Sequence, residues 1–95
     1  MSVRSENLFK ALADGQRRRI LTMLRGSEMA AGEIAEQLGL TPATVSHHLS
    51  RLKGADLVRA RREGQQRIYT INVSVVEEAL MLLAGIIRTD EEKTS

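Results

Sequence analysis

Apolar side chains recur at three- and four-residue intervals through the first quarter of the chain, which is the spacing of one helix face. The pattern predicts a first helix from Ser5 that ends before Asp14 and Gly15. A second helix follows at once, with Asp14 as its N-cap and Gly26 at its end. The apolar positions of the two helices are Leu8, Phe9, Leu12, Ala13, Ile20, Leu21, Met23 and Leu24.

Two further helices, joined by a very short turn, are predicted within residues 31–53. Gly39 closes the first of them, and Thr41 and Pro42 are a good N-cap and first residue for the second, which stops at Gly54. A turn this short, with a glycine free to take positive φ, folds one helix sharply across the other. The segment therefore reads as a helix-turn-helix.

Alternating apolar and basic residues then predict two strands, at residues 57–62 and 67–71, joined by a turn that contains Gly64. A helix-turn-helix followed directly by a basic hairpin is the arrangement of a winged helix. We expect one mainly α domain over residues 1–95, with five helices and a β-hairpin wing at about residues 57–71.

The last helix is expected at about residues 73–89, starting near Asn72 or Ser74 and reaching about Thr89. It carries two apolar stripes about 100° apart. One comprises Val76, Leu80, Leu83 and Ile87, and the other Val75, Ala79, Leu82 and Ile86. A small domain needs one stripe to reach its own core, so the second is left for a partner.

This surplus of apolar surface predicts a homodimer through the first and last helices. The predicted interface residues are Leu8, Phe9, Val75, Ala79, Leu82 and Ile86. A last helix buried on both sides within one protomer is the alternative. The charged tail, residues 90–95, is expected to fray.

The net charge of +2 conceals a gradient along the chain. Residues 1–40 carry +1, residues 41–72 carry +4, and residues 73–95 carry −3. The positive excess thus coincides with the helix-turn-helix and wing, which suggests a surface that faces a polyanion; a merely solvated face is the alternative.

Composition excludes several classes of site. The chain has no cysteine, which removes disulfides, thiolate nucleophiles and cysteine-ligated metals. Phe9 and Tyr69 are its only aromatic residues, too few for a base-stacking platform. No apolar run is long enough for a secretory signal or a membrane span, so we expect a cytoplasmic protein without membrane insertion.

The outward face of the fourth helix is polar and small, because its apolar residues Val45, Leu49 and Leu52 point to the core. Such side chains can enter the major groove of double-stranded DNA, where hydroxyls and imidazoles meet base edges and cations meet phosphate or guanine. The predicted contacts on this helix are Ala43, Thr44, Ser46, His47, Ser50, Arg51 and Lys53.

The wing offers a second set of contacts: Arg61, Arg62, Gln65, Gln66 and Arg67. Arginine at a hairpin tip can enter a minor groove and glutamine can bond to its acceptors. An ordinary solubilising hairpin is the alternative. Two other polar residues, His48 and Arg17, lie beside apolar stripes and are expected to pack, with the Arg17 head paired to a carboxylate.

Metal binding and catalysis find little support. His47 and His48 diverge by about 100° on a helix and cannot share one ion, and their neighbours one turn away are not ligands. The glycines form no phosphate-binding pattern, and no serine lies beside an evident His–carboxylate relay. We expect no enzyme, metal or cofactor.

These segments resemble the ArsR/SmtB family of bacterial winged-helix repressors. The matching strings lie at residues 9–14, 17–21, 32–35, 44–49 and 57–64 and at Tyr69, within a match from about residue 7 to residue 88. The string Ser46-His47-His48-Leu49 is the most specific of them. The resemblance implies a dimer that clamps an inverted repeat, with paired recognition helices about 34 Å apart in successive major grooves.

Metal sensors of that family carry Cys ligands, or His and Asp ligands on the last helix, and this chain lacks them there. It is more similar to the metal-independent branch that includes the SdpR-type autorepressors. We therefore expect a sequence-specific transcriptional repressor whose inducing signal, and any regulatory protein partner, stay open. The alternatives are a winged-helix protein-interaction module and a repressor with an unrecognised ligand at the dimer interface.

Overall fold

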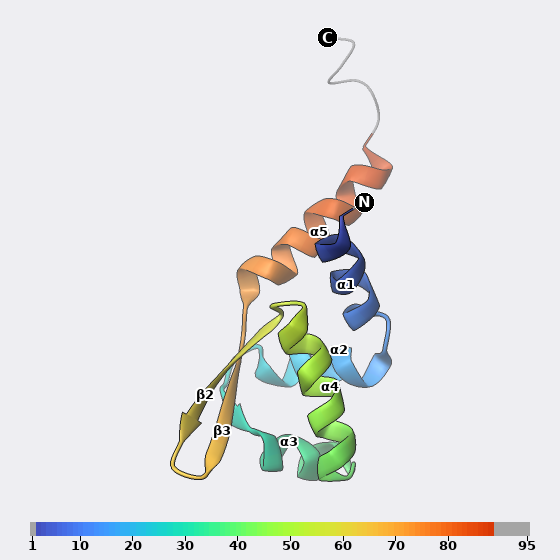
Figure 1. Cartoon of the computed structure of the whole chain (residues 1–95). Helices are drawn as coiled ribbons and strands as arrows, with labels where there is room; N and C mark the ends of the chain where they lie inside the picture. Colours follow the sequence, from blue (N-terminus) through green and yellow to red (C-terminus); the bar gives the residue numbers. More distant parts are fainter. Residues whose placement is uncertain (1, 89–95) are drawn as a thin grey trace.

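Two groups of elements divide the fold, which a computed structural model describes for residues 2–88 (Figure 1). The first and last helices lie together at one end, and the helix-turn-helix and the sheet form the other. The elements in chain order are α1 (Val3–Leu12), α2 (Gly15–Leu24), β1 (Met29–Ala30), α3 (Ala31–Leu38), α4 (Pro42–Gly54), β2 (Val58–Glu63), β3 (Gln66–Ile71) and α5 (Val73–Ile87). The expected winged helix-turn-helix architecture is confirmed; Thr89 and the tail 90–95 lie outside the described residues.

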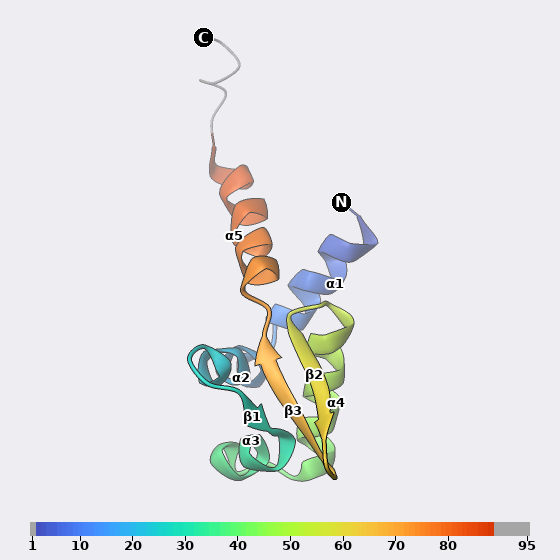
Figure 2. The ribbon, with the colours of Figure 1, turned by 90° about the vertical axis from the view of Figure 1, so that its left-hand side faces the viewer.

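The sheet has three strands rather than the predicted two, in the order β1-β3-β2. In β1, Met29 and Ala30 pair antiparallel with Tyr69 and Ile68 of β3. Figure 2 shows β1 entering the sheet immediately before α3. Two residues are too few to show an alternating pattern, so sequence periodicity could not reveal this strand.

The core lies between α2, α3, α4 and the sheet, and α1 and α5 contribute Leu8, Ala11, Val75 and Ala79 to it. Its most deeply buried side chains come from every layer of the fold: Leu8, Ile20, Leu24, Ile34, Val45, Leu49, Leu52, Leu57 and Val58. Ala35 is also buried, and its small side chain lets α3 and α4 cross closely.

Local capping chemistry sets most of the helix boundaries. Asp14 accepts hydrogen bonds from the backbone N–H groups of Gln16 and Arg17, and Thr41 accepts one from Thr44. Gly39 adopts φ 68°, the left-handed conformation that the short turn between α3 and α4 requires. These three features are confirmed as predicted.

Helix α4 ends at Gly54, as predicted, but the positive φ of 60° falls on Asp56 and not on this glycine. Asp56 N–H donates to the Lys53 carbonyl and Leu57 N–H to the Leu52 carbonyl, the paired bonds of a Schellman motif. Aspartate is one of the few non-glycine residues that tolerate this conformation.

Asp56 also anchors the ends of α1 and α5. Its carbonyl accepts from the buried Asn72 side chain at 3.0 Å, and its carboxylate pairs with Arg4 of α1 at 3.0 Å. Arg4 also bonds to Glu78 of α5, and this contact lowers the pKa of the Glu78 carboxyl. The turn after α4 is thus linked to both helices at the other end of the fold.

The predicted use of the first and last helices in a dimer needs a correction. Leu8, Val75 and Ala79 are at most 6% exposed and pack into the protomer's own core, so they are not available to a partner. Leu82 and Ile86 are exposed and Phe9 is half-buried. From Leu80 onward both stripes of α5 are uncovered: Leu80, Leu83 and Ile87 are 65%, 49% and 80% exposed, and Leu82 and Ile86 are 37% and 74% exposed.

Candidate nucleic-acid interface

Helix α4 presents one buried and one exposed face. Val45, His48, Leu49 and Leu52 are buried against the core. The predicted contact residues all lie on the exposed side: Ala43, Thr44, Ser46, His47, Ser50, Arg51 and Lys53. The N-terminal half of this face is uncharged and small, and its two cations stand in the last turns. An element of this shape fits a major groove about 12 Å wide.

His48 is packed as predicted, at 8% exposed, and its partner is Arg17 of α2. Arg17 Nη1 lies 3.4 Å from His48 Nδ1. The rest of the guanidinium does not meet the expected carboxylate. It donates to the carbonyl oxygens of Ala11 at 2.7 Å and Lys10 at 3.0 Å, so it caps the C-terminal end of α1.

The wing is a hairpin of β2 and β3 with a two-residue loop, Gly64 and Gln65. Gly64 has φ 64°, which a II′-type hairpin loop requires at its first position. Arg62 of β2 stands directly opposite Arg67 of β3, so both side chains project from the same face of the hairpin. Gln65 and Gln66 are exposed at the tip as predicted.

Arg61 behaves differently from its two neighbours. Because strand side chains alternate, it projects from the opposite face to Arg62. Its guanidinium pairs with Glu28, just before β1, and with Glu63 at 3.1 Å, and these bonds raise the pKa of Arg61. Its charge is therefore neutralised within the protein, and the predicted role of Arg61 as a phosphate anchor is weakened in favour of positioning the wing.

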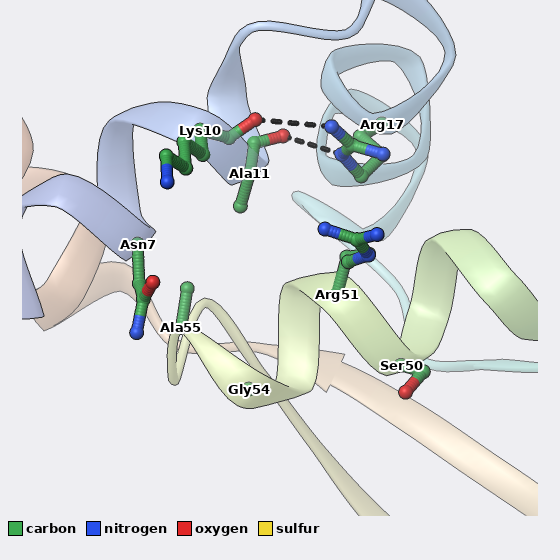
Figure 3. A pocket seen from close by; sticks show the side chains of 8 residues that line it. All are labelled: Asn7, Lys10, Ala11, Arg17, Ser50, Arg51, Gly54 and Ala55. Atoms are coloured by element: carbon green, nitrogen blue, oxygen red, sulfur yellow. Dashed lines mark hydrogen bonds between the residues drawn. The ribbon is translucent and has the colours of Figure 1, made fainter.

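Two basic recesses flank α4, one on each side. On the wing side, a recess of about 210 Å³ is lined by Lys53, Ala60, Arg61, Arg62 and Arg67. On the other side, a pocket of about 220 Å³ lies between α1, α2 and α4, with Lys10, Arg17 and Arg51 in its lining (Figure 3). No Asp or Glu lines either recess. The polar face of α4 thus runs between two cationic borders.

Residues 2–88 contain no group of three or more His, Cys, Asp or Glu side chains that could hold a metal ion. In the same residues, none of the helices has the length and apolar character needed to cross a membrane.

The sequence predicted Arg62 and Arg67 as part of the candidate site. It did not predict that Lys10 and Asn7 line the pocket between α1, α2 and α4.

Comparison with known proteins agrees with this architecture. Residues 14–60 match the model of the bacterial regulatory protein arsR family. The transcriptional repressor SdpR of Bacillus subtilis is 38% identical over 81 residues, which span 85% of this chain and 90% of SdpR. The chain belongs to the ArsR family.

Solved structures of other ArsR-type regulators share the fold. HlyU from Vibrio cholerae, named as a transcriptional activator, superposes with a TM-score of 0.73 at 33% identity, over 88% of this chain and 91% of HlyU. A homodimeric winged helix-turn-helix DNA-binding domain from Mycobacterium bovis gives a TM-score of 0.74 at 34% identity, over 87% of this chain and 78% of that domain. The ArsR family and these relatives are transcriptional regulators, not enzymes.

Proposed function

We propose that this ArsR-family regulator is a repressor that binds an inverted-repeat operator as a homodimer. Each protomer places α4 in a major groove, and the two grooves lie about one helical turn, roughly 34 Å, apart. Since the relatives are bacterial proteins, the site of action is the cytoplasm, where the genome lies.

One observation carries the proposal: an uncharged polar helix face lies between two cationic recesses. A helix in a major groove has base edges below it and a phosphate strand on either side. The charge distribution around α4 has the same three-part order. A surface meant only for solvation has no reason to separate its polar and cationic side chains in this way.

The role proposed for each residue follows from where it lies relative to the exposed face of α4. Thr44, Ser46 and His47 lie on the uncharged part of the face and are assigned to base edges. Arg51, Lys53, Arg62 and Arg67 border it and are assigned to phosphates. The exposed apolar face of α5 supports the dimer, because a second copy of α5 and α1 would cover it.

The test uses duplexes selected from a random pool with the wild-type protein. His47→Ala should lower affinity for the selected duplex about 10-fold or more, with little change for a shuffled duplex, since a good base contact contributes roughly 1–3 kcal/mol of discrimination. Lys53→Gln is the control, and it should weaken binding to both duplexes by similar factors.

Equal losses on both duplexes for His47→Ala would remove that residue from base reading. A selection that enriches no sequence at all, with only weak binding to any DNA, would favour the protein-interaction module instead of a repressor.

A further inference from the structure

The pocket between α1, α2 and α4 has the lining of an anion site. Asn7 and Lys10 come from α1, Arg17 from α2, and Ser50 and Arg51 from α4. Its volume of about 220 Å³ is more than enough for one phosphate group with its water shell. Figure 3 shows the Arg51 side chain extending from α4 on the side where Arg17 lies, with Lys10 and Asn7 on the α1 side.

The cations of this pocket differ in how they are already used. The Arg17 guanidinium is occupied by the Lys10 and Ala11 carbonyl oxygens and by His48. Within residues 2–88, the Lys10 ammonium and the Arg51 guanidinium have no hydrogen-bond or ion-pair partner. Lys10 and Arg51 therefore bring two positive charges to one recess without a carboxylate to balance them.

The partial negative charges at two helix C-termini disfavour an anion in this pocket, but their effect is small. The C-terminal ends of α1 and α4 both lie near the pocket, and each carries the equivalent of about half a negative charge. Arg17 already caps α1, and backbone N–H groups of residues 55–57 cap α4. The Asp14 carboxylate, whose pKa Arg17 helps to lower, offsets part of the Arg17 charge. The Lys10 and Arg51 charges still outweigh the two capped helix ends, so the recess stays attractive to an anion.

We propose that this pocket binds a phosphate, and that its source is the DNA backbone beside the major groove that α4 occupies. The inference rests on the proposed function and adds Lys10 and Asn7 of α1 to the contact surface. Ser50 and Arg51 belong both to the pocket and to the exposed face of α4, so a strand that runs along α4 passes over the pocket. The wing-side recess receives the opposite strand in the same way.

Helical geometry keeps this site clear of the proposed dimer contact. Around α1, Asn7 lies about 160° and Lys10 about 100° from Phe9, the half-buried residue predicted to join the partner. A phosphate bound at Asn7 and Lys10 is therefore compatible with a dimer.

Lys10→Gln tests the site without touching its backbone contacts. The Lys10 carbonyl still accepts from Arg17, and the side chain is exposed, so the fold should be retained in a thermal melt. Each phosphate contact contributes about 0.9 to the slope of log affinity against log salt. With one site per protomer, the slope should become about 2 units less steep. Arg19→Gln, an exposed cation on α2 outside the pocket, is the matched control and should leave the slope unchanged.

Neutral methylphosphonate substitution locates the contact on the DNA. Scanning the linkages beside each half-site should reveal one whose substitution weakens wild-type binding several-fold but leaves Lys10→Gln unaffected. Titration of the DNA-free protein with inorganic phosphate, at constant ionic strength, tests whether the pocket binds free phosphate instead of a phosphate of the DNA backbone.

The inference is overturned if Lys10→Gln keeps the wild-type slope while wild type itself binds the selected duplex with steep salt dependence. A second result would overturn the assignment of the phosphate to DNA. In that case Lys10→Gln abolishes saturable binding of inorganic phosphate but leaves the salt dependence of DNA binding unchanged. Failure of the proposed function gives a different result, because the wild-type protein itself then shows no preference for the selected duplex over the shuffled one.

Discussion

At the scale of single residues, Arg17 joins three segments of the fold. Its guanidinium donates to two carbonyls at the end of α1 and approaches His48 of α4. Since arginine has only donors, His48 Nδ1 is the acceptor in this contact and the ring proton lies on Nε2. One cation on α2 thereby links the end of α1 to α4, and His48 stays buried on the side of α4 that faces the core.

Asp56 gives a prediction about stability. Asp56→Ala and Asp56→Gly both remove the carboxylate that pairs with Arg4, so they differ only in the backbone. Alanine is strained at φ 60° and glycine is not, so the alanine variant should be less stable by about 1 kcal/mol. Urea unfolding of the two variants measures the difference; equal midpoints would show that the cap geometry is relaxed in solution.

Asp14 gives a prediction about pH. Hydrogen bonds from the N–H groups of Arg17 and Gln16 lower the pKa of its carboxyl below the unfolded value. Its stabilising contribution is therefore complete above about pH 4 and is lost as the pH falls through the lower, folded pKa. Asp14→Asn keeps a capping oxygen but cannot titrate. Wild type should lose more thermal stability than this variant between about pH 5 and pH 2, and parallel losses would contradict the assignment.

Sequence reasoning worked at the residue scale where the chemistry is local. The caps Asp14 and Thr41 and the left-handed Gly39 act within three residues of themselves, so neighbouring letters reveal them. The partner of Arg17 lies across the fold, and periodicity could show that it packs but not that it caps α1. Gly54 likewise marked the end of α4 correctly, although the left-handed residue that follows the helix is Asp56.

At the scale of elements, the wing separates two arginines that are adjacent in sequence. Both arginines line the recess beside α4, but Arg62 stands opposite Arg67, whereas the Arg61 guanidinium is paired with Glu28 and Glu63. Arg62→Gln should make the salt dependence of DNA binding about 2 units less steep per dimer. Arg61→Gln should change it less, since an already neutralised side chain releases fewer counterions. Equal changes in slope would mean that DNA displaces the carboxylates from Arg61.

The elements themselves were largely predictable, and their packing was less so. Five helices and the hairpin follow from periodicity and turn residues. The orientation of α5 does not, because its two stripes are equally apolar. Long-range contacts accompany the orientation seen: Asn72, just before α5, bonds to the Asp56 carbonyl, and Val75 and Ala79 are buried.

At the scale of the whole molecule, the uncovered apolar surface of α5 predicts the oligomeric state. Leu80→Glu places a charge at a side chain that is 65% exposed in the protomer, so the fold should tolerate it while the dimer dissociates. Ser74→Glu adds the same charge to an exposed position on the other side of α5 and should stay dimeric. Sedimentation equilibrium distinguishes the two, and a Leu80→Glu variant that remains dimeric would move the interface elsewhere.

The charge gradient along the chain anticipated where the candidate site lies but not its extent. Residues 41–72 supply α4 and the wing, as their net charge of +4 suggested. Lys10 and Arg17 come from the near-neutral first segment, and only the fold brings them beside Arg51. Counting charges along the sequence cannot reveal a site whose side chains come from three separate helices.

The most direct test of the central claim is the affinity of the wild-type protein for a selected duplex and a shuffled one, measured from about 50 to about 200 mM salt. Four phosphate-assigned residues per protomer give about eight contacts per dimer, so log affinity for the selected duplex should fall against log salt with a slope of about −7. The selected duplex should bind at least about 10³-fold more tightly than the shuffled one. A flat salt dependence, or equal affinity for the two duplexes, would contradict an α4 that reads bases between two phosphate-binding borders.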